Sequence, residues 1–204
     1  MPLSFNPVKA DESLRKLGIH ADERDYRLDY PALADEIRNL AELGLSDELH
    51  RLMRKFAKDD LFFLGYFILD LPINHPFLIA RCNEVHEDAH FTLDLWSREH
   101  FKSSIITFMK TIHDLIINPE ERIGIFSFNR ALAKGHMRRI KTALEQNMKL
   151  KRLFPEIFYM NPSAQAPKWS EDEGIYVKRK KVYNEASVEA VSYTHLTLPT
   201  KRIV

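Results

Sequence analysis

The chain has 204 residues, a length that suits one domain or one domain with an appendage. Hydrophobic residues make up 45% of it and charged residues 29%, which supplies a core and excludes a disordered polar chain. The net charge is only +1, so the overall charge indicates no polyanionic partner. Any basic surface must therefore come from local clustering.

The single cysteine, Cys82, excludes an internal disulfide framework and a zinc site built from cysteines. No apolar run approaches the ~18 residues that a membrane-spanning helix needs, and the start of the chain does not resemble a signal peptide. We therefore expect a soluble, intracellular protein without a membrane partner.

Residues 1–60 predict a helical lead-in. Up to residue 30 the sequence is polar and lacks a sustained apolar period, which is typical of a loosely attached segment. Pro31 and Ser46 then suit the starts of two amphipathic helices. The aromatic residues 61–69 are interpreted as core, and residues 75–89 as a helix with Phe77 facing inward.

Beyond residue 90 the pattern changes to alternating strands and helices. This order predicts βαβ units and hence an α/β fold, with a parallel sheet covered by helices. Residues 123–128 are nearly all apolar, as in a strand buried on both faces. The expected strands are 91–96 and 123–128, with weaker candidates at 175–178 and 187–191, and the expected helices are 105–117 and 131–147.

The loop after residues 91–96 carries the most informative side chains. Lys102 and Ser103 match the end of the phosphate-loop pattern G-x-x-x-x-G-K-[ST], in which the Lys reaches phosphate oxygens and the hydroxyl binds Mg²⁺. Trp96 and Phe101 occupy its two glycine positions. A bulky residue held in the left-handed conformation costs about 1 to 3 kcal/mol. The pattern by itself leaves open that Lys102 and Ser103 merely begin a helix.

The run LWSREHFKSSIIT at residues 95–107, with the strand and basic helix that follow it, closely resembles the ATPase part of the large subunit of tailed-phage terminases. These proteins are DNA-packaging motors. The family has a deviant Walker A loop with an Arg four residues before the Lys, where Arg98 stands here. The resemblance covers residues 60–190. It implies a RecA-like P-loop NTPase core that is incomplete at the C-terminus, because the Walker B acids and the catalytic Glu are missing.

The resemblance also implies roles for individual residues, with ATP and Mg²⁺ as cofactors. Lys102 would bind the β- and γ-phosphates, and Ser103 would hold Mg²⁺. Arg98 would act in cis on the transferred phosphoryl group, so Arg98 and Lys102 would be the catalytic residues. A salt bridge to Glu99 or a solvated charge remains the alternative for Arg98. The loop residues expected at the nucleotide are Ser97, Arg98, Glu99, His100, Phe101, Lys102, Ser103 and Ser104.

The function implied by the resemblance is that of a motor subunit. The intact protein would couple ATP hydrolysis to the packaging of double-stranded DNA into procapsids in the host cytoplasm. It would work as a homo-oligomeric ring on the portal protein, with the terminase small subunit as a partner and a nuclease domain in the missing part. This chain alone is expected to be inactive as an ATPase. A helicase-like P-loop motor and a non-catalytic DNA-binding module remain alternatives.

Two charged segments outside the loop have competing interpretations. Lys134, Arg138 and Lys141 form a basic stripe on the helix 131–147, which is either a DNA contact or a solvated helix face. The acidic residues 171–173 follow polar, Pro-containing sequence, whereas Walker B acids end an apolar strand. We therefore interpret these acids as part of a loop.

Two further patterns are not favoured as sites. His86 and His90 formally match the zinc motif H-E-x-x-H, but no third ligand follows. Phe63, Tyr66 and Phe67 could include an aromatic ring that stacks on adenine, although a core cluster is the preferred interpretation.

Residues 191–204 do not continue the preceding pattern. They resemble the translation of a transposon-end adapter used in sequencing libraries, and we expect them to be non-native. The predicted organisation is thus a helical lead-in at 1–60 and a partial P-loop ATPase domain at 61–190.

Overall fold

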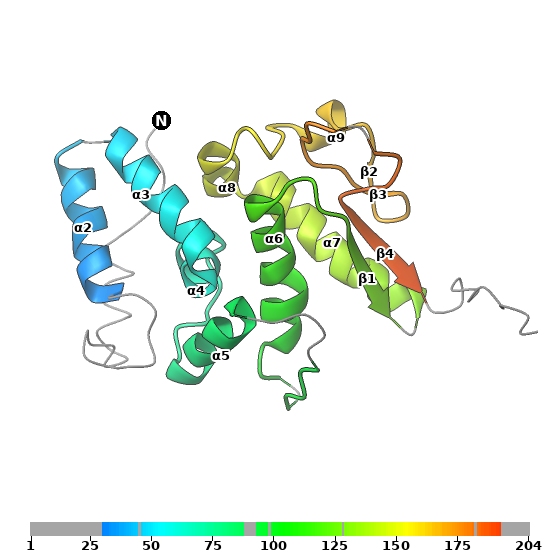
Figure 1. The fold of residues 1–204 in the computed structure, drawn as a ribbon, viewed down its shortest axis with the longest axis horizontal. Helices are drawn as coiled ribbons and strands as arrows, with labels where there is room; N and C mark the ends of the chain where they lie inside the picture. Colours follow the sequence, from blue (N-terminus) through cyan, green and yellow to red (C-terminus); the bar gives the residue numbers. More distant parts are fainter. Residues whose placement is uncertain are drawn as a thin grey trace, which may run out of the picture.

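The computed structural model describes residues 30–44, 46–87, 93–97, 99–127, 129–181 and 183–192. Predictions for the segment before Tyr30, and for His90, Arg98 and residues 193–204, lie outside these ranges. The chain forms a mixed α/β structure in which helices α2 to α6 lie beside a small sheet backed by α7 (Figure 1). Within the described ranges, none of the helices combines the length and the hydropathy needed to cross a membrane.

The helices agree closely with the periodicity of the sequence. Predicted starts at Pro31 and Ser46 correspond to α2 and α3, and the apolar residues 105–117 lie in the consecutive helices η2 and α6. The two elements labelled η are π-helices. The helical elements are α2 (Tyr30–Glu42), α3 (Ser46–Asp59), α4 (Leu61–Phe63), η1 (Leu64–Ile68), α5 (Pro76–His86), η2 (Ser103–Lys110), α6 (Thr111–Ile117), α7 (Arg130–Gln146), α8 (Met148–Leu153) and α9 (Pro162–Gln165).

Within the described residues, the sheet contains four strands in the order β1-β4-β3-β2. Only β1 and β4 are parallel, with Ile123 opposite Val188, whereas β3 pairs antiparallel with both of its neighbours. The expected all-parallel sheet is therefore wrong, because the chain returns through a tight turn between β2 and β3. The strands are β1 (Ile123–Ser127), β2 (Trp169–Ser170), β3 (Gly174–Ile175) and β4 (Val188–Ser192). The last strand thus runs past the boundary predicted at residue 190.

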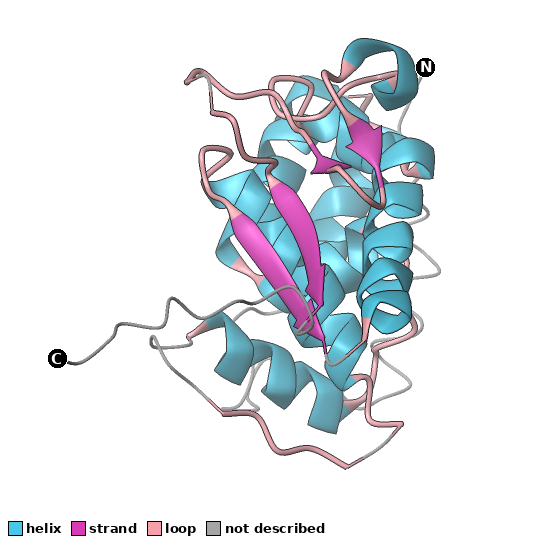
Figure 2. Cartoon of the chain, turned by 90° about the vertical axis from the view of Figure 1, so that its right-hand side faces the viewer, coloured by secondary structure: helices cyan, strands magenta, loops and turns pink. Residues whose placement is uncertain are grey.

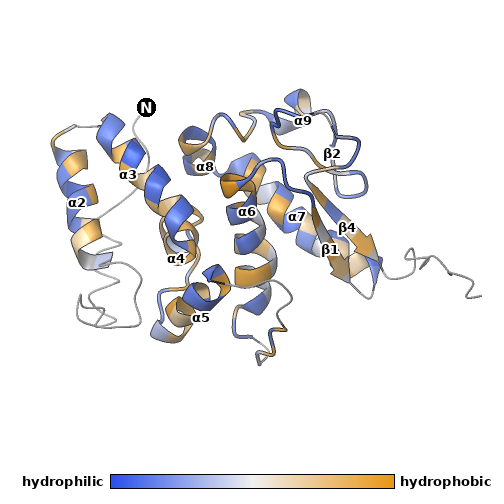
Figure 3. Cartoon of the chain, in the orientation of Figure 1, coloured by the Kyte–Doolittle hydropathy of each residue, from blue (hydrophilic) through white to orange (hydrophobic). Residues whose placement is uncertain are grey.

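Helices lie behind β1 and β4 on one face of the sheet (Figure 2). Ile125 points into the core and is buried, whereas Phe126 on the opposite face is 62% exposed. The prediction that this strand is buried on both faces is wrong, since β1 is an edge strand with helices against one side. The apolar residues of both strands appear orange in Figure 3.

The first predicted strand is absent from the described part of its segment. Residues 93–97 have no regular secondary structure, and Leu93 and Leu95 are 81% and 83% exposed. Alternation of polar and apolar residues stabilises a strand only when a neighbouring strand pairs with its backbone and a core receives its apolar face. Neither condition is met in the described part of residues 91–96.

The core connects the helices near the start of the chain to the later elements. Buried residues of α2 and α3 share one cluster with α4, η1, α5, η2, α6 and α7. The carboxylate of Asp60, which is 0% exposed, is buried beside this core. It accepts a hydrogen bond from the Tyr30 hydroxyl at 3.0 Å and caps α4 through the Phe63 amide at 2.5 Å. This carboxylate therefore ties the start of α2 to the start of α4.

We predict that Asp60→Ala lowers the free energy of unfolding by about 2 kcal/mol, because it removes a helix cap and leaves the buried Tyr30 hydroxyl without this acceptor. Urea denaturation measures the change. The neighbouring Asp59→Ala is the control, since Asp59 is exposed at the end of α3, and its midpoint should match the wild type. Equal midpoints for both variants would show that the cap does not stabilise the fold.

Candidate phosphate-binding site

The loop before η2 has an unusual backbone. Glu99 and Phe101 have φ angles of 65° and 58°, in the left-handed region, although neither is glycine. The backbone of Lys102 has the right-handed helical conformation, with φ of −48° and ψ of −56°, and η2 begins at the next residue, Ser103. Alternation of left- and right-handed residues turns successive N–H groups toward one point, which makes a concavity for an anion. Phe101 thus has the conformation for which the phosphate-loop pattern uses glycine, whereas Trp96, at the first glycine position, does not.

A cavity of about 350 Å³ opens at this loop. Six of the eight residues predicted to contact the nucleotide line it, at the start of η2. Of the other two, His100 lines a second, neighbouring cavity, and Arg98 lies outside the described residues. The lining residues are Trp96, Ser97, Glu99, Phe101, Lys102, Ser103 and Ser104. The amine, the hydroxyls and the helix start would favour an anion, and the Glu99 carboxylate would oppose it.

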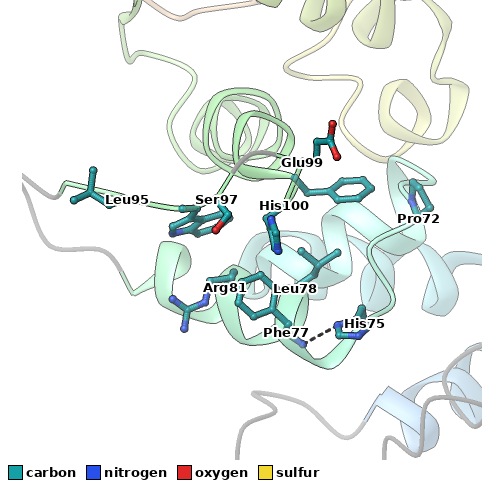
Figure 4. A pocket seen from close by; sticks show the side chains of 11 residues that line it. Pro72, His75, Phe77, Leu78, Arg81, Leu95, Ser97, Glu99 and His100 are labelled. Atoms are coloured by element: carbon teal, nitrogen blue, oxygen red, sulfur yellow. Dashed lines mark hydrogen bonds between the residues drawn. The ribbon is translucent and has the colours of Figure 1, made fainter.

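A second cavity, of about 670 Å³, is shown in Figure 4. It shares Trp96, Ser97, Glu99 and Phe101 with the first. Phe77 and Arg81 of α5 line it together with Trp96 and His100 of the loop. The Phe77 and His100 rings meet edge to face at 5.7 Å, and the Arg81 guanidinium lies 5.5 Å from the centre of the Phe77 ring and 6.0 Å from that of Trp96. The Nε of Arg81 is buried without a hydrogen-bond partner in the described structure.

Local sequence explains how α5 presents this wall. His75 caps the helix by accepting a hydrogen bond from the Phe77 amide at its Nδ1, at 3.2 Å, and Pro76 occupies the first turn (Figure 4). The prediction that Phe77 faces inward is wrong, because its ring is 43% exposed at the cavity. Periodicity placed Phe77 on the apolar stripe, and only the position of the loop opposite α5 reveals its exposure.

The earlier aromatic cluster belongs to the core, as preferred from the sequence. Phe63 and Phe67 are 0% and 1% exposed, with ring centroids 4.7 Å apart. Tyr66 is half-buried and packs edge to face on Phe67 and parallel to Phe62. Since the rings of Phe63 and Phe67 are sealed from solvent, neither can stack on a bound base.

Helix α7 also reaches the loop, which the sequence did not predict. The Arg139 guanidinium donates a hydrogen bond to the Ser104 hydroxyl at 2.8 Å and lies 4.5 Å from the centre of the Phe108 ring. Partial burial lowers the pKa of Arg139 from its ordinary value. No local pattern in the sequence indicates which helix will face the loop, or that Arg139 will be the residue in contact with Ser104.

The candidate DNA-contact residues of α7 are paired with carboxylates. Lys134 lies 2.6 Å from Asp172, Arg138 makes two hydrogen bonds of 2.9 Å to Glu171, and Lys141 lies 3.9 Å from Glu145. Arg130 also contacts Asp172, at 2.7 Å. The acidic residues form the turn between β2 and β3, so their interpretation as a loop is confirmed. This turn is anchored along the basic stripe.

The sequence offered a zinc motif that begins at His86 and a Mg²⁺ ligand at Ser103. Within the described residues, no group of three or more His, Cys, Asp or Glu side chains could hold a metal ion. His86 instead packs against His113, with ring centroids 5.1 Å apart. Ser103, which the resemblance implies would hold Mg²⁺, lines the loop cavity, and its hydroxyl is an oxygen ligand of the kind that Mg²⁺ takes.

Comparison with known proteins found no matching family model, no similar curated protein and no similar solved structure.

The paired acids of the β2–β3 turn predict a pH dependence of stability. Arg138 lowers the pKa of Glu171 below its ordinary 4.5, and Lys134 and Arg130 lower the pKa of Asp172 below its ordinary 3.8, chiefly through hydrogen bonds. A lowered folded-state pKa contributes stability above the ordinary pKa, and this stability is lost as the pH falls through the folded-state pKa. Both acids are solvent-accessible, so the effect is small and sensitive to salt.

We therefore expect the Glu171→Gln/Asp172→Asn double variant to have a lower urea midpoint than the wild type at pH 7, with a smaller difference at pH 3. Glu173→Gln in the same turn is the control, since Glu173 contacts Lys168 and not α7. It should follow the wild type at both pH values. A difference that persists unchanged at pH 3 would contradict the assignment.

Proposed function

We propose that this chain is the nucleotide-binding part of an ATP-driven DNA-packaging motor, a large terminase subunit with a RecA-like P-loop core. One observation carries the nucleotide half of the proposal. The loop with left-handed Glu99 and Phe101 leads into Lys102 and Ser103 at the start of a buried helix and lines a cavity. A helix that merely begins with Lys and Ser needs no strained loop, and such strain concentrates at functional sites.

The two adjoining cavities suit the two halves of ATP. Phosphates would occupy the smaller cavity, where Lys102, Ser103 and the loop amides converge and Ser103 would ligate Mg²⁺. The base would enter the larger cavity, where the aromatic side chains of Phe77 and Trp96 line the wall. Arg98 keeps its proposed role in cis at the transferred phosphoryl group.

The fold supports the finer assignment in one respect. Parallel strands β1 and β4, with the intervening α7 packed on both, are a feature of P-loop cores. Glu99 is the only carboxylate among the described residues that line either cavity. Since it belongs to the loop itself, we propose that the chain binds ATP with little turnover.

The DNA half of the proposal rests on the terminase resemblance. It includes the packaging of double-stranded DNA, a ring on the portal protein, the small subunit as partner and action in the host cytoplasm. Lys134, Arg138 and Lys141 remain the proposed contacts, but DNA phosphates would have to replace the carboxylates that now pair with them. Because these basic side chains are already paired with carboxylates, the structure does not support the alternative of a non-catalytic DNA-binding module.

The first test is titration of the protein with MgATP by calorimetry. Lys102→Ala should weaken binding by about 100-fold or more, because it removes the charge-assisted contact to phosphate. Lys110→Ala is the matched control, since Lys110 lies on the same helix but pairs with Asp114, and it should bind as the wild type does. Wild-type protein that does not bind MgATP, or equal effects of the two substitutions, would refute the nucleotide site.

The left-handed position of Glu99 yields a second test. Glu99→Gly should raise the free energy of unfolding by up to about 1 kcal/mol, because glycine adopts a positive φ without strain and Glu99 is exposed. It should also strengthen MgATP binding by removing a carboxylate from the cavity. Glu99→Gln separates the effects, since it should improve binding without raising stability. Weaker binding by both variants would show that the carboxylate assists the ligand.

A further inference from the structure

Arg139 occupies a defined position between α7 and the phosphate loop. Its guanidinium donates to Ser104 Oγ at 2.8 Å and lies 4.5 Å from the centre of the Phe108 ring. Ser104 and Phe108 are both on η2, and Phe108 is buried. The side chain is thus held at its tip by a hydroxyl and along its plane by a ring, which sets the direction of its charge.

The hydrogen bond constrains the Ser104 hydroxyl. A hydroxyl has one proton to donate and two lone pairs, whereas a guanidinium can only donate. Ser104 Oγ must therefore accept from Arg139, and its own proton must point elsewhere. Ser104 lines the 350 Å³ cavity beside Lys102 and Ser103. Its proton is consequently available to an acceptor in that cavity.

Adjacent arginines of α7 have different surroundings. Arg138 pairs with Glu171 of the β2–β3 turn, while Arg139 points to η2. Successive residues of an α-helix are rotated by about 100°, so the two side chains leave the helix in different directions. Of these two arginines, Arg139 brings its charge to the start of η2, and arginine stays protonated at neutral pH.

We propose that Arg139 is a positioning residue for the nucleotide. It holds Ser104 as an acceptor, so that the Ser104 hydroxyl donates to a phosphate oxygen in the loop cavity. The inference rests on the proposed nucleotide site and adds α7 to it. Changes in the position of α7 relative to η2 would then alter nucleotide affinity.

A double-mutant cycle on the whole chain tests this role. Arg139→Met retains an unbranched chain over Phe108 but removes the donors, and Ser104→Ala removes the hydroxyl. MgATP titration should show about a tenfold loss of affinity for each variant. The double variant should lose no more than either single variant, because both remove the same interaction. Arg139→Lys should recover part of the loss.

Arg130→Met is the matched control, because Arg130 is also on α7 but pairs with Asp172, and it should bind MgATP as the wild type does. Wild-type affinity in Arg139→Met, or losses that multiply in the double variant, would overturn the proposal, since a purely structural contribution is independent of Ser104. If Arg139→Met does not fold, the affinity of Ser104→Ala decides alone, and unchanged affinity refutes the proposal.

The cycle can fail without refuting the nucleotide site. If the wild type binds MgATP and Lys102→Ala abolishes binding, a failed cycle refutes only the role of Arg139. If the wild type does not bind MgATP, both the nucleotide site and the role of Arg139 are refuted.

Discussion

The burial of the helix formed by η2 and α6 is the constraint on which the rest of the structure depends. Ile105, Met109 and Ile112 are 0% exposed, and η2 packs against η1, α5 and α7. The approach to η1 is so close that a Cβ on Gly65 would lie 2.3 Å from Met109 Cε. Because this packing determines where η2 begins, the preceding loop must reach that point even through left-handed, non-glycine residues.

The same packing explains how a site can form without glycine. Each non-glycine residue with a left-handed backbone conformation costs about 1 to 3 kcal/mol. Burial of a few large apolar side chains offsets this cost. Phe101 contributes to that burial, since it packs partly against the core. The loop therefore combines strain with anchoring, and Lys102 and Ser103 line one cavity with it. Helix α7 stabilises the arrangement from one side through Arg139 and holds the β2–β3 turn through its other basic residues.

Much of the local structure was predictable from the sequence. Ser46 marks the start of α3, and the apolar periodicity of residues 105–117 and 131–147 corresponds to η2, α6 and α7. The strand at 91–96 was not found in its described part, because alternation needs a paired neighbour. The aromatic wall of the larger cavity was missed too, since Phe77 belongs to the apolar stripe of α5 by spacing and becomes exposed only where the loop lies opposite.

The sequence by itself determined helices α2, α3, α5, η2, α6 and α7, the buried aromatic cluster and the placement of Lys102 and Ser103 at a helix start, because these follow from spacing within one segment. Tertiary structure alone decided the left-handed loop, the pairing of α7 with Glu171 and Asp172, and the contact of Arg139 with Ser104. Each of these joins residues from segments that packing brings together, or requires a backbone conformation that packing imposes. Intrinsic preferences of the residues concerned do not specify them.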